Sequence, residues 1–342
     1  MGKPAGLITG IYSRNTLRQP ADKVIGKKML RCEKISKFYG HFCALSDLDM
    51  YIQDGALYGF VGPNGAGKTT AIKIMTGILH PDSGQVTIDG KVPGVDNALL
   101  KERIGYVPDT FGVYNDLKVR EYMEFFASCS GLGGLTLRNR VTELLKYVGL
   151  HDREDFYVEA LSKGMQQKLS LARALINDPD YLIMDEPTSG LDPRTRYEFK
   201  QMVSALSDNG KTIVISSHIL SDITELCTDI GIIDQGSIVL GGRLDRVMKK
   251  LTAGNPIIVI VSSRISEAAA FIRAEKKVSA VSVKGHEIMF YFEGSQDEES
   301  ALLRRLIEAG LPVRSFSREK GSLESIFMQI TGPGNEQTLL SF

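Results

Sequence analysis

Short, continuous apolar runs alternate with longer amphipathic stretches along residues 29–250. Residues 57–61 (LYGFV), 181–184 (YLIM) and 212–215 (TIVI) are apolar almost throughout, which is typical of strands buried on both faces. A glycine-rich loop follows the first run, and residues 69–75 then have helical spacing. Strands that alternate with helices in this way predict an α/β domain with a mostly parallel sheet covered by helices.

Residues 119–150 are predicted to form two helices. The break between them is expected near Gly131, Gly133 and Gly134, because glycine ends helices readily. We expect these helices to lie in a helical subdomain at about residues 95–160.

The pattern changes after the Gly-Asn-Pro sequence at residues 254–256. Strands and helices now follow one another in the order β-α-β-β-α-β, which is the order of a ferredoxin-like α+β domain. The predicted ranges are 257–261 (strand), 265–274 (helix), 278–283 and 287–292 (strands), 297–309 (helix) and 313–316 (strand).

A length of 342 residues suits two domains, at about 150 residues per domain. The predicted divisions are a flexible basic tail (1–28), an α/β domain (29–250), an accessory domain (255–330) and a second tail (331–342). The first tail holds six basic side chains and one acid, without the apolar stretch of a secretory signal. It is either a plain extension, a start placed upstream of the working one, or a segment that lies near anionic lipid.

The charge balance narrows the range of partners. The chain has 41 Lys and Arg against 41 Asp and Glu, so its formal net charge is zero. A broad nucleic-acid surface needs clustered basic excess, so we expect no nucleic-acid partner. No apolar run approaches the ~18 residues of a membrane span, so any work at a membrane is expected to go through a partner.

The cysteines are interpreted as structural residues without a chemical role. All four are widely spaced and none forms a CxxC pair: Cys32, Cys43, Cys129 and Cys227. Scattered thiols are typical of small buried side chains in a reducing compartment, and neither a disulfide framework nor a zinc site is indicated.

The loop after the strand at 57–61 fits the pattern G-x-x-x-x-G-K-[ST]. Its glycines allow backbone N–H groups to turn inward around phosphates at the start of the next helix. Lysine supplies a charge to the terminal phosphates, and the first threonine hydroxyl is a ligand for Mg²⁺. The residues are Gly62, Pro63, Asn64, Gly65, Ala66, Gly67, Lys68, Thr69 and Thr70.

Two acids end the apolar run at 181–184. A carboxylate at the end of a neighbouring strand is the second requirement of a nucleotide site, since it holds the metal. We expect Asp185 to take this role and Glu186 to polarise the attacking water. Without the phosphate loop, the pair would be only a solvated strand end.

At this point the chain resembles ABC ATPases over roughly residues 30–245. Leu161-Ser162-Lys163-Gly164-Met165 is similar to the family signature LSGGQ, about 24 residues before Asp185. Ser189-Gly190-Leu191-Asp192 is similar to the loop that follows the second carboxylate. Tyr39 stands at the position of the aromatic residue that stacks on adenine, and His218 matches the switch histidine.

The resemblance implies a site shared between two copies of the chain. Ser162 and the Gly164 N–H would bind the γ-phosphate of ATP held by the other copy, in a head-to-tail dimer. His218 would contact the γ-phosphate and orient the water, with Lys68 and Glu186 as the other catalytic residues. Read alone, Ser162 is a helix cap, and Tyr39 is a half-buried strand aromatic.

Three positions depart from the family pattern: Asp109, Lys163 and Met165, which replaces the signature Gln. Asp109 stands where Gln is common; its oxygen suits Mg²⁺ but it adds negative charge, and an acid here resembles the exporter branch that serves separate permeases. Lys163 replaces a signature glycine and opposes the helix dipole, at a cost of up to ~1 kcal/mol.

The resemblance therefore implies an ATPase subunit that drives export through separate membrane permeases, at the cytoplasmic face of the membrane. The extra C-terminal domain is expected to serve dimer contact or regulation. Aromatics of the helical region are interpreted either as a groove for a permease helix or as core; they are Phe111, Tyr114, Tyr122, Phe125 and Phe126. A cassette that acts on nucleic acid or ribosomes, and a regulatory ATP-binding module, are the competing functions.

Overall fold

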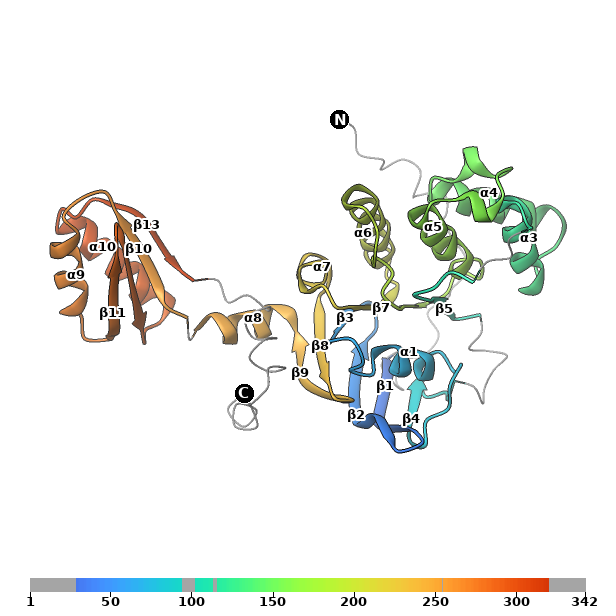
Figure 1. Ribbon diagram of the computed structural model, residues 1–342, viewed down its shortest axis with the longest axis horizontal. Coiled ribbons are helices and arrows are strands. Elements are labelled where there is room, and N and C mark those ends of the chain that lie inside the picture. The colour runs from blue at the N-terminus through green and yellow to red at the C-terminus, as the bar shows by residue number, and fades with distance from the viewer. Residues whose placement is uncertain (1–28, 94–101, 113–115, 254, 320–342) are drawn as a thin grey trace, which may run out of the picture. The chain divides into compact units, whose positions relative to one another are not determined.

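The structure is a computed structural model that describes residues 29–93, 102–112, 116–253 and 255–319, without the side chains of 249–253. The chain divides between Leu244 and Asp245 into two compact units, each with a hydrophobic core of its own (Figure 1). The predicted tails at 1–28 and 331–342 lie outside the described residues.

A six-stranded sheet forms the centre of the first unit (Figure 1). Neighbouring strands pair in parallel except at the last edge, where β9 runs antiparallel to β8. This confirms the predicted, mostly parallel sheet. Its strands, in spatial order, are β5 (Ile104–Val107), β6 (Tyr181–Met184), β7 (Thr212–Ser217), β3 (Leu57–Val61), β8 (Asp229–Asp234) and β9 (Ser237–Arg243).

A second, antiparallel sheet packs against the first around helix α1 (Lys68–Met75). Side chains of both sheets and of the helix, among them Leu48, Ile72 and Tyr181, share one core. The main strands are buried on both faces, which explains their continuous apolar sequences. The strands of this second sheet are β2 (Phe42–Gln53), β1 (Met29–Tyr39) and β4 (Ser83–Ile88).

Helices cover the opposite face of the main sheet and form the helical region (Figure 1). The predicted break between two helices is confirmed at Gly131, whose φ of 80° suits a residue without a Cβ. The helices are α3 (Val119–Cys129), α4 (Gly134–Tyr147), α5 (Lys163–Ala174), α6 (Pro193–Asp208) and α7 (Leu220–Leu226), with short 3₁₀ turns at His151–Arg153 and Val158–Ala160.

The second unit contains helix α8 (Leu244–Ala253), which begins at its boundary, and a ferredoxin-like domain. Its four-stranded antiparallel sheet has the order β11-β12-β10-β13, and helix side chains pack on the sheet in a separate core. The predicted order of elements is confirmed. They are β10 (Ile257–Val261), α9 (Ile265–Arg273), β11 (Val278–Lys284), β12 (Glu287–Phe292), α10 (Gln296–Glu308) and β13 (Val313–Arg318).

The parallel arrangement brings four loops to one edge of the main sheet. Strands β5, β6, β7 and β3 are consecutive neighbours, so their carboxyl ends meet at the same edge. In open α/β sheets, ligands bind outside the carboxyl ends of the strands. The phosphate loop, Asp109, Asp185 and His218 all follow these strand ends.

Candidate nucleotide-binding site

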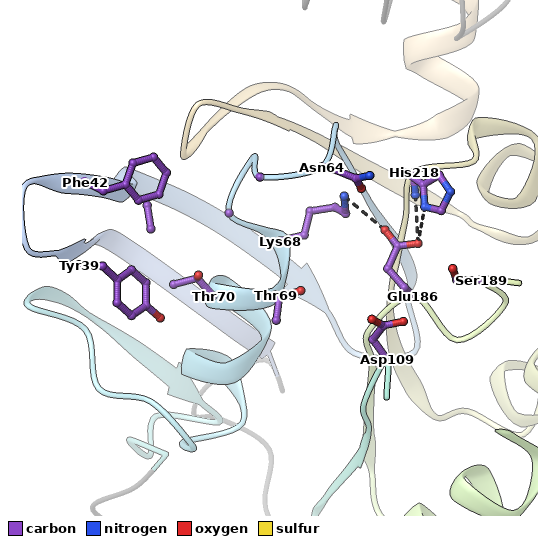
Figure 2. A pocket seen from close by; sticks show the side chains of 13 residues that line it. Tyr39, Phe42, Asn64, Lys68, Thr69, Thr70, Asp109, Glu186, Ser189 and His218 are labelled. Atoms are coloured by element: carbon purple, nitrogen blue, oxygen red, sulfur yellow. Dashed lines mark hydrogen bonds and ion pairs between the residues drawn. The ribbon is translucent and has the colours of Figure 1, made fainter. Parts of the chain in front are cut away.

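A cavity of about 530 Å³ opens at this edge (Figure 2). The phosphate loop, the strand ends and the hairpin between β1 and β2 all contribute to its wall. The lining residues are Tyr39, Phe42, Ala44, Asn64, Gly65, Gly67, Lys68, Thr69, Thr70, Asp109, Glu186, Ser189 and His218. Most of the residues that the sequence suggested for nucleotide binding thus lie together.

The phosphate loop turns tightly and leads directly into α1. The Ala66 N–H donates to the Pro63 carbonyl at 3.2 Å, and Gly67, at the N-cap of α1, has a φ of 105°. A Cβ at Gly67 would lie 2.5 Å from the Ala44 carbonyl oxygen, so only glycine fits there. The N–H groups in the first turn of a helix that begins in this way are suited to an anion.

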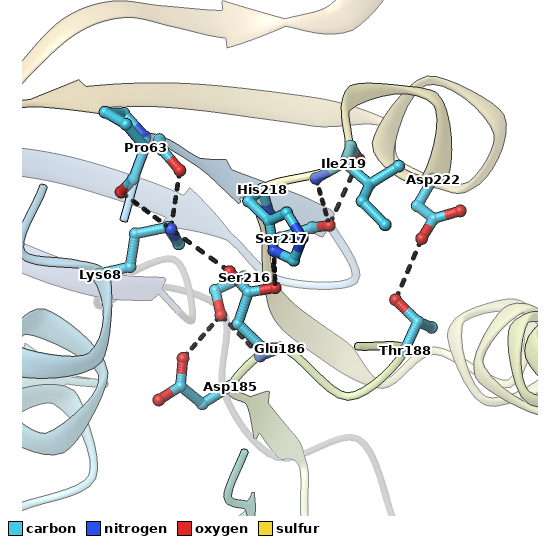
Figure 3. A network of polar contacts seen from close by, with 11 residues as sticks. Pro63, Lys68, Asp185, Glu186, Thr188, Ser216, Ser217, His218, Ile219 and Asp222 are labelled. Atoms are coloured by element: carbon cyan, nitrogen blue, oxygen red, sulfur yellow. Dashed lines mark hydrogen bonds and ion pairs between the residues drawn. The ribbon is translucent and has the colours of Figure 1, made fainter. Parts of the chain in front are cut away.

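Lys68 is buried inside this loop, with 6% of its side chain exposed. Its Nζ donates to the carbonyl oxygens of Gly62 at 2.7 Å and Pro63 at 3.2 Å. The same Nζ lies 3.3 Å from Oε1 of Glu186 (Figure 3). The ammonium group therefore faces both the loop and the acid that follows β6. Gly62 and Pro63 take part through these carbonyls, and none of Gly62, Pro63 and Ala66 lines the cavity.

Asp185 is buried directly after the end of β6 and does not line the cavity. Its Oδ1 accepts a hydrogen bond from the Ser216 hydroxyl at 2.8 Å (Figure 3). Burial raises the pKa of Asp185, the nearby negative charges of Asp109 and Glu186 add to this, and hydrogen bonds from Ser216 and Thr69 oppose it. A buried carboxylate beside other carboxylates is an arrangement that a cation would relieve.

The oxygens here fit Mg²⁺ only in part. A hydroxyl and two carboxylates, those of Thr69, Asp185 and Asp109, are the hard ligands that Mg²⁺ prefers. Within the described ranges, however, no group of three His, Cys, Asp or Glu side chains is placed to hold a metal ion. Mg²⁺ usually keeps waters and phosphate oxygens as ligands, so the donor set suits a metal that arrives with a nucleotide.

Glu186 has a strained backbone, with a φ of 45° in the left-handed region. Such a conformation costs about 1–3 kcal/mol and persists only where neighbours hold it. Its N–H donates to the Ser216 Oγ at 2.8 Å, and its Oε2 lies 2.7 Å from Nδ1 of His218. The carboxylate thus stands between Lys68 and His218, at the cavity wall (Figures 2 and 3).

Two aromatic rings line the part of the cavity formed by the β1–β2 hairpin. Tyr39 and Phe42 are directly paired across the turn, and both are exposed, by 51% and 60%. Figure 2 shows the two side chains beyond Thr70, away from Glu186. Flat, exposed rings suit stacking on a nucleobase.

Sequence reasoning missed Phe42 and Ser216 as functional residues, and it placed Ser189 in the loop after the second carboxylate without giving it a role. Phe42 joins the cavity only through its pairing with Tyr39, and Ser216 reaches Asp185 and Glu186 from the neighbouring strand β7. Both contacts depend on strand pairing. The one signal available in the sequence was that a second aromatic residue, Phe42, follows Tyr39 closely.

The signature residues lie outside this cavity. Ser162 caps helix α5 and accepts from the Met165 N–H at 3.3 Å. Gly164 packs so closely on α6 that a Cβ would lie 2.5 Å from Cγ2 of Thr195. Lys163 extends over Gly190, with Nζ 2.6 Å from the place a Cβ would take. Ser162 and Gly164 are therefore not brought to the phosphate loop of their own chain.

Some aromatic residues of the helical region belong to its core, and at least one is exposed, as a groove for a permease helix would require. Tyr122 and Phe111 are buried, and their ring centroids are 5.4 Å apart, so these two are core. Phe125 is 45% exposed. Tyr114 lies outside the described residues. No helix in the part of the chain that the structure describes is long and apolar enough to cross a membrane.

Two family models match the chain. Residues 45–189 match the model described as ABC transporter, and residues 242–331 match the model described as ATP-binding protein DrrA1-3-like, C-terminal domain.

Curated relatives match nearly end to end. The linearmycin resistance ATP-binding protein LnrL of Bacillus subtilis is 34% identical over 89% of this chain and 98% of its own length. The Nod factor export ATP-binding protein I of Ralstonia nicotianae is 30% identical over 92% of this chain and 97% of its own length.

Solved structures match part of the chain. An ATP-binding subunit of an ABC transporter is 28% identical, with a TM-score of 0.59 over 65% of this chain and 92% of that one. A dimeric ATP-binding cassette in a post-hydrolysis state, bound to ADP and Pi, is 27% identical, with a TM-score of 0.58 over 63% of this chain and 98% of that one.

Proposed function

Because the chain belongs to the ABC transporter family, as an ATP-binding subunit of an export-type system, we propose that two copies close on two ATP molecules and drive separate permease subunits. The chain is an ATPase whose hydrolysis is coupled to transport. Closing and reopening of the dimer would pull on the membrane subunits. The chain would then lie at the cytoplasmic face of the membrane, held there by the permeases.

Within one copy, the two ends of the cavity would bind different parts of the nucleotide. Tyr39 and Phe42 would stack on adenine, and the N–H groups of the phosphate loop with Lys68 would hold the phosphates. Mg²⁺, when bound, would neutralise charge on the phosphates and would be held by Thr69, Asp185 and Asp109.

The observation that carries the proposal is the position of Glu186. Its carboxylate faces Lys68 at 3.3 Å and His218 at 2.7 Å, in the wall of the cavity. Glu186 would accept a proton from the attacking water, and His218 would orient that water and contact the γ-phosphate. Lys68 would leave Glu186 and pair with phosphate oxygens.

The signature residues support a shared site. Ser162 and the Gly164 N–H stand at the start of α5, a place suited to an anion, and they do not line the cavity of their own chain. In the proposed dimer they would reach the γ-phosphate of the partner's ATP. The second unit would serve dimer contact or regulation.

Glu186→Gln tests this assignment. The amide cannot take up a proton, so turnover should fall at least about 100-fold while ATP binding is kept. With MgATP the variant should accumulate as a dimer. Turnover is measured by phosphate release, and assembly by light scattering.

Glu143→Gln, on the surface of α4, is the matched control and should behave as wild type. If Glu186→Gln hydrolysed ATP at the wild-type rate, Glu186 would not be the base. A monomer in the presence of MgATP would contradict the shared site.

A further inference from the structure

A second buried carboxylate, Asp222, lies beside the catalytic loop but does not line the cavity. Its side chain is 4% exposed. Oδ2 accepts a hydrogen bond from the Thr188 hydroxyl at 3.1 Å (Figure 3), and Oδ1 lies 2.5 Å from Nζ of Lys200. We call Thr188, Asp222 and Lys200 the Asp222 anchor.

The Asp222 anchor connects three elements. Thr188 stands two residues after Glu186 in the loop that follows β6, and Asp222 lies in the first turn of α7, four residues after His218. Lys200 belongs to α6, which begins where that loop ends. The anchor therefore joins the segment that carries Glu186 to the segment that carries His218.

The loop needs such a fixed point because the backbone of Glu186 is strained. Ser216 holds the Glu186 N–H, and the Ser189 N–H donates to the Glu186 carbonyl at 3.0 Å. Between these contacts, Thr188 is the loop residue whose side chain reaches Asp222. A left-handed glutamate stays in place only if its surroundings determine it at several points.

The charge of Asp222 is matched inside the protein. Burial acts to lower the pKa of Lys200, but hydrogen bonds to Asp222 and Glu225 raise it overall, so the ammonium group stays charged. The Asp222 carboxylate is thus paired and has an oxygen left for Thr188. Removing the Thr188 hydroxyl alone breaks the link to the loop and keeps the ion pair.

We propose that the Asp222 anchor consists of positioning residues, which hold the Glu186 carboxylate against His218 in the geometry needed for hydrolysis. The inference rests on the proposed role of Glu186 as the base. None of the three side chains lines the nucleotide cavity, so they act through Glu186 and His218 rather than on ATP.

Thr188→Val tests the anchor, because valine has the shape of threonine without the hydroxyl. The kcat for ATP should fall at least about tenfold, since a small misplacement of a catalytic group is costly. The KM for ATP and the dissociation constant should stay within about twofold of wild type. Thr188→Ser, which restores the hydroxyl, should recover the kcat. Thr188→Ala should show the same loss as valine, and it stands in if valine does not fold.

Thr224→Val on α7 is the matched control. Its hydroxyl donates to the Ser221 carbonyl, away from the catalytic loop, so its kcat should match wild type. Glu186→Gln is measured in the same assay. An inactive Glu186→Gln beside a Thr188→Val variant of wild-type kcat would overturn the anchor and leave the proposed function standing. A kcat loss in Thr188→Val that serine does not recover would also overturn it.

Discussion

Asp185 shows how function and stability oppose each other at a single residue. The carboxylate is buried among other acids, and its pKa is raised chiefly by that burial. The folded chain therefore keeps a proton on Asp185 at pH values where the unfolded chain has released it. As the pH rises from about 3.8 through the raised value, stability falls, and above it the penalty stays constant.

Asp185→Asn should consequently stabilise the nucleotide-free chain at pH 7, by roughly 1 kcal/mol. The gain should shrink as the pH falls through the raised pKa of Asp185, because a growing share of the wild-type carboxyl is then protonated. Urea midpoints at pH 7 and at pH 4.5 measure the difference. Asp155→Asn, in an exposed turn outside the helices, is the control and should show no gain. An equal gain at both pH values would contradict the account.

Candidate site residues could be predicted where they lie in a short, continuous sequence motif. Lys68 and Thr69 stand at fixed positions in the phosphate loop, and Asp185 and Glu186 directly follow an apolar run. Phe42 and Ser216 could not be predicted in this way, because their contacts depend on which strands pair. Site geometry set by pairing is invisible to a single sequence.

At the scale of elements, short apolar runs and glycine breaks were enough to predict most of the helices and strands. β3, β6, β10 and β12 occupy the predicted ranges, because strands buried on one or both faces have a clear pattern. The exact ends of the elements were predicted less accurately. β7 continues to Ser217, two residues past the apolar run, because Ser216 and Ser217 still pair with β3. Helix α10 begins at Gln296, since Ser295 and Glu298 form a capping box.

Helix α5 permits a test of the proposed dimer. Ser162→Ala removes a cap, at a cost of about 1 kcal/mol, and removes a proposed γ-phosphate donor. Dimer closure on MgATP, measured in the Glu186→Gln background, should be impaired, and ATP affinity of the monomer should stay nearly unchanged.

Ser295→Ala separates the loss of a helix cap from the loss of a phosphate donor. Ser295 caps α10 through a hydrogen bond of 3.3 Å, the same length as the one that Ser162 accepts in α5. It should lower stability to a similar extent and leave dimer closure intact. Equal loss of monomer affinity and closure in Ser162→Ala would show that Ser162 does not act across two copies.

At the scale of the whole molecule, two separate cores imply two unfolding events. The predicted division of the chain into domains stays a prediction, and calorimetry tests it. A nonhydrolysable ATP analogue with Mg²⁺, at about 100 times its Kd, adds about 2.7 kcal/mol to the unit that binds it. For a unit of this size, its transition should rise by roughly 5–10 °C. The other transition should stay fixed, and a shift of both would contradict independent units.

The contact between Lys68 and Glu186 has a consequence for the order of events. One cation, the Lys68 ammonium group, lies 3.3 Å from the carboxylate of the proposed base. In the proposed mechanism, phosphate oxygens would take over this cation and the carboxylate would be set free. Substrate binding and release of the base would then be a single exchange, so that the base could act only once ATP is bound.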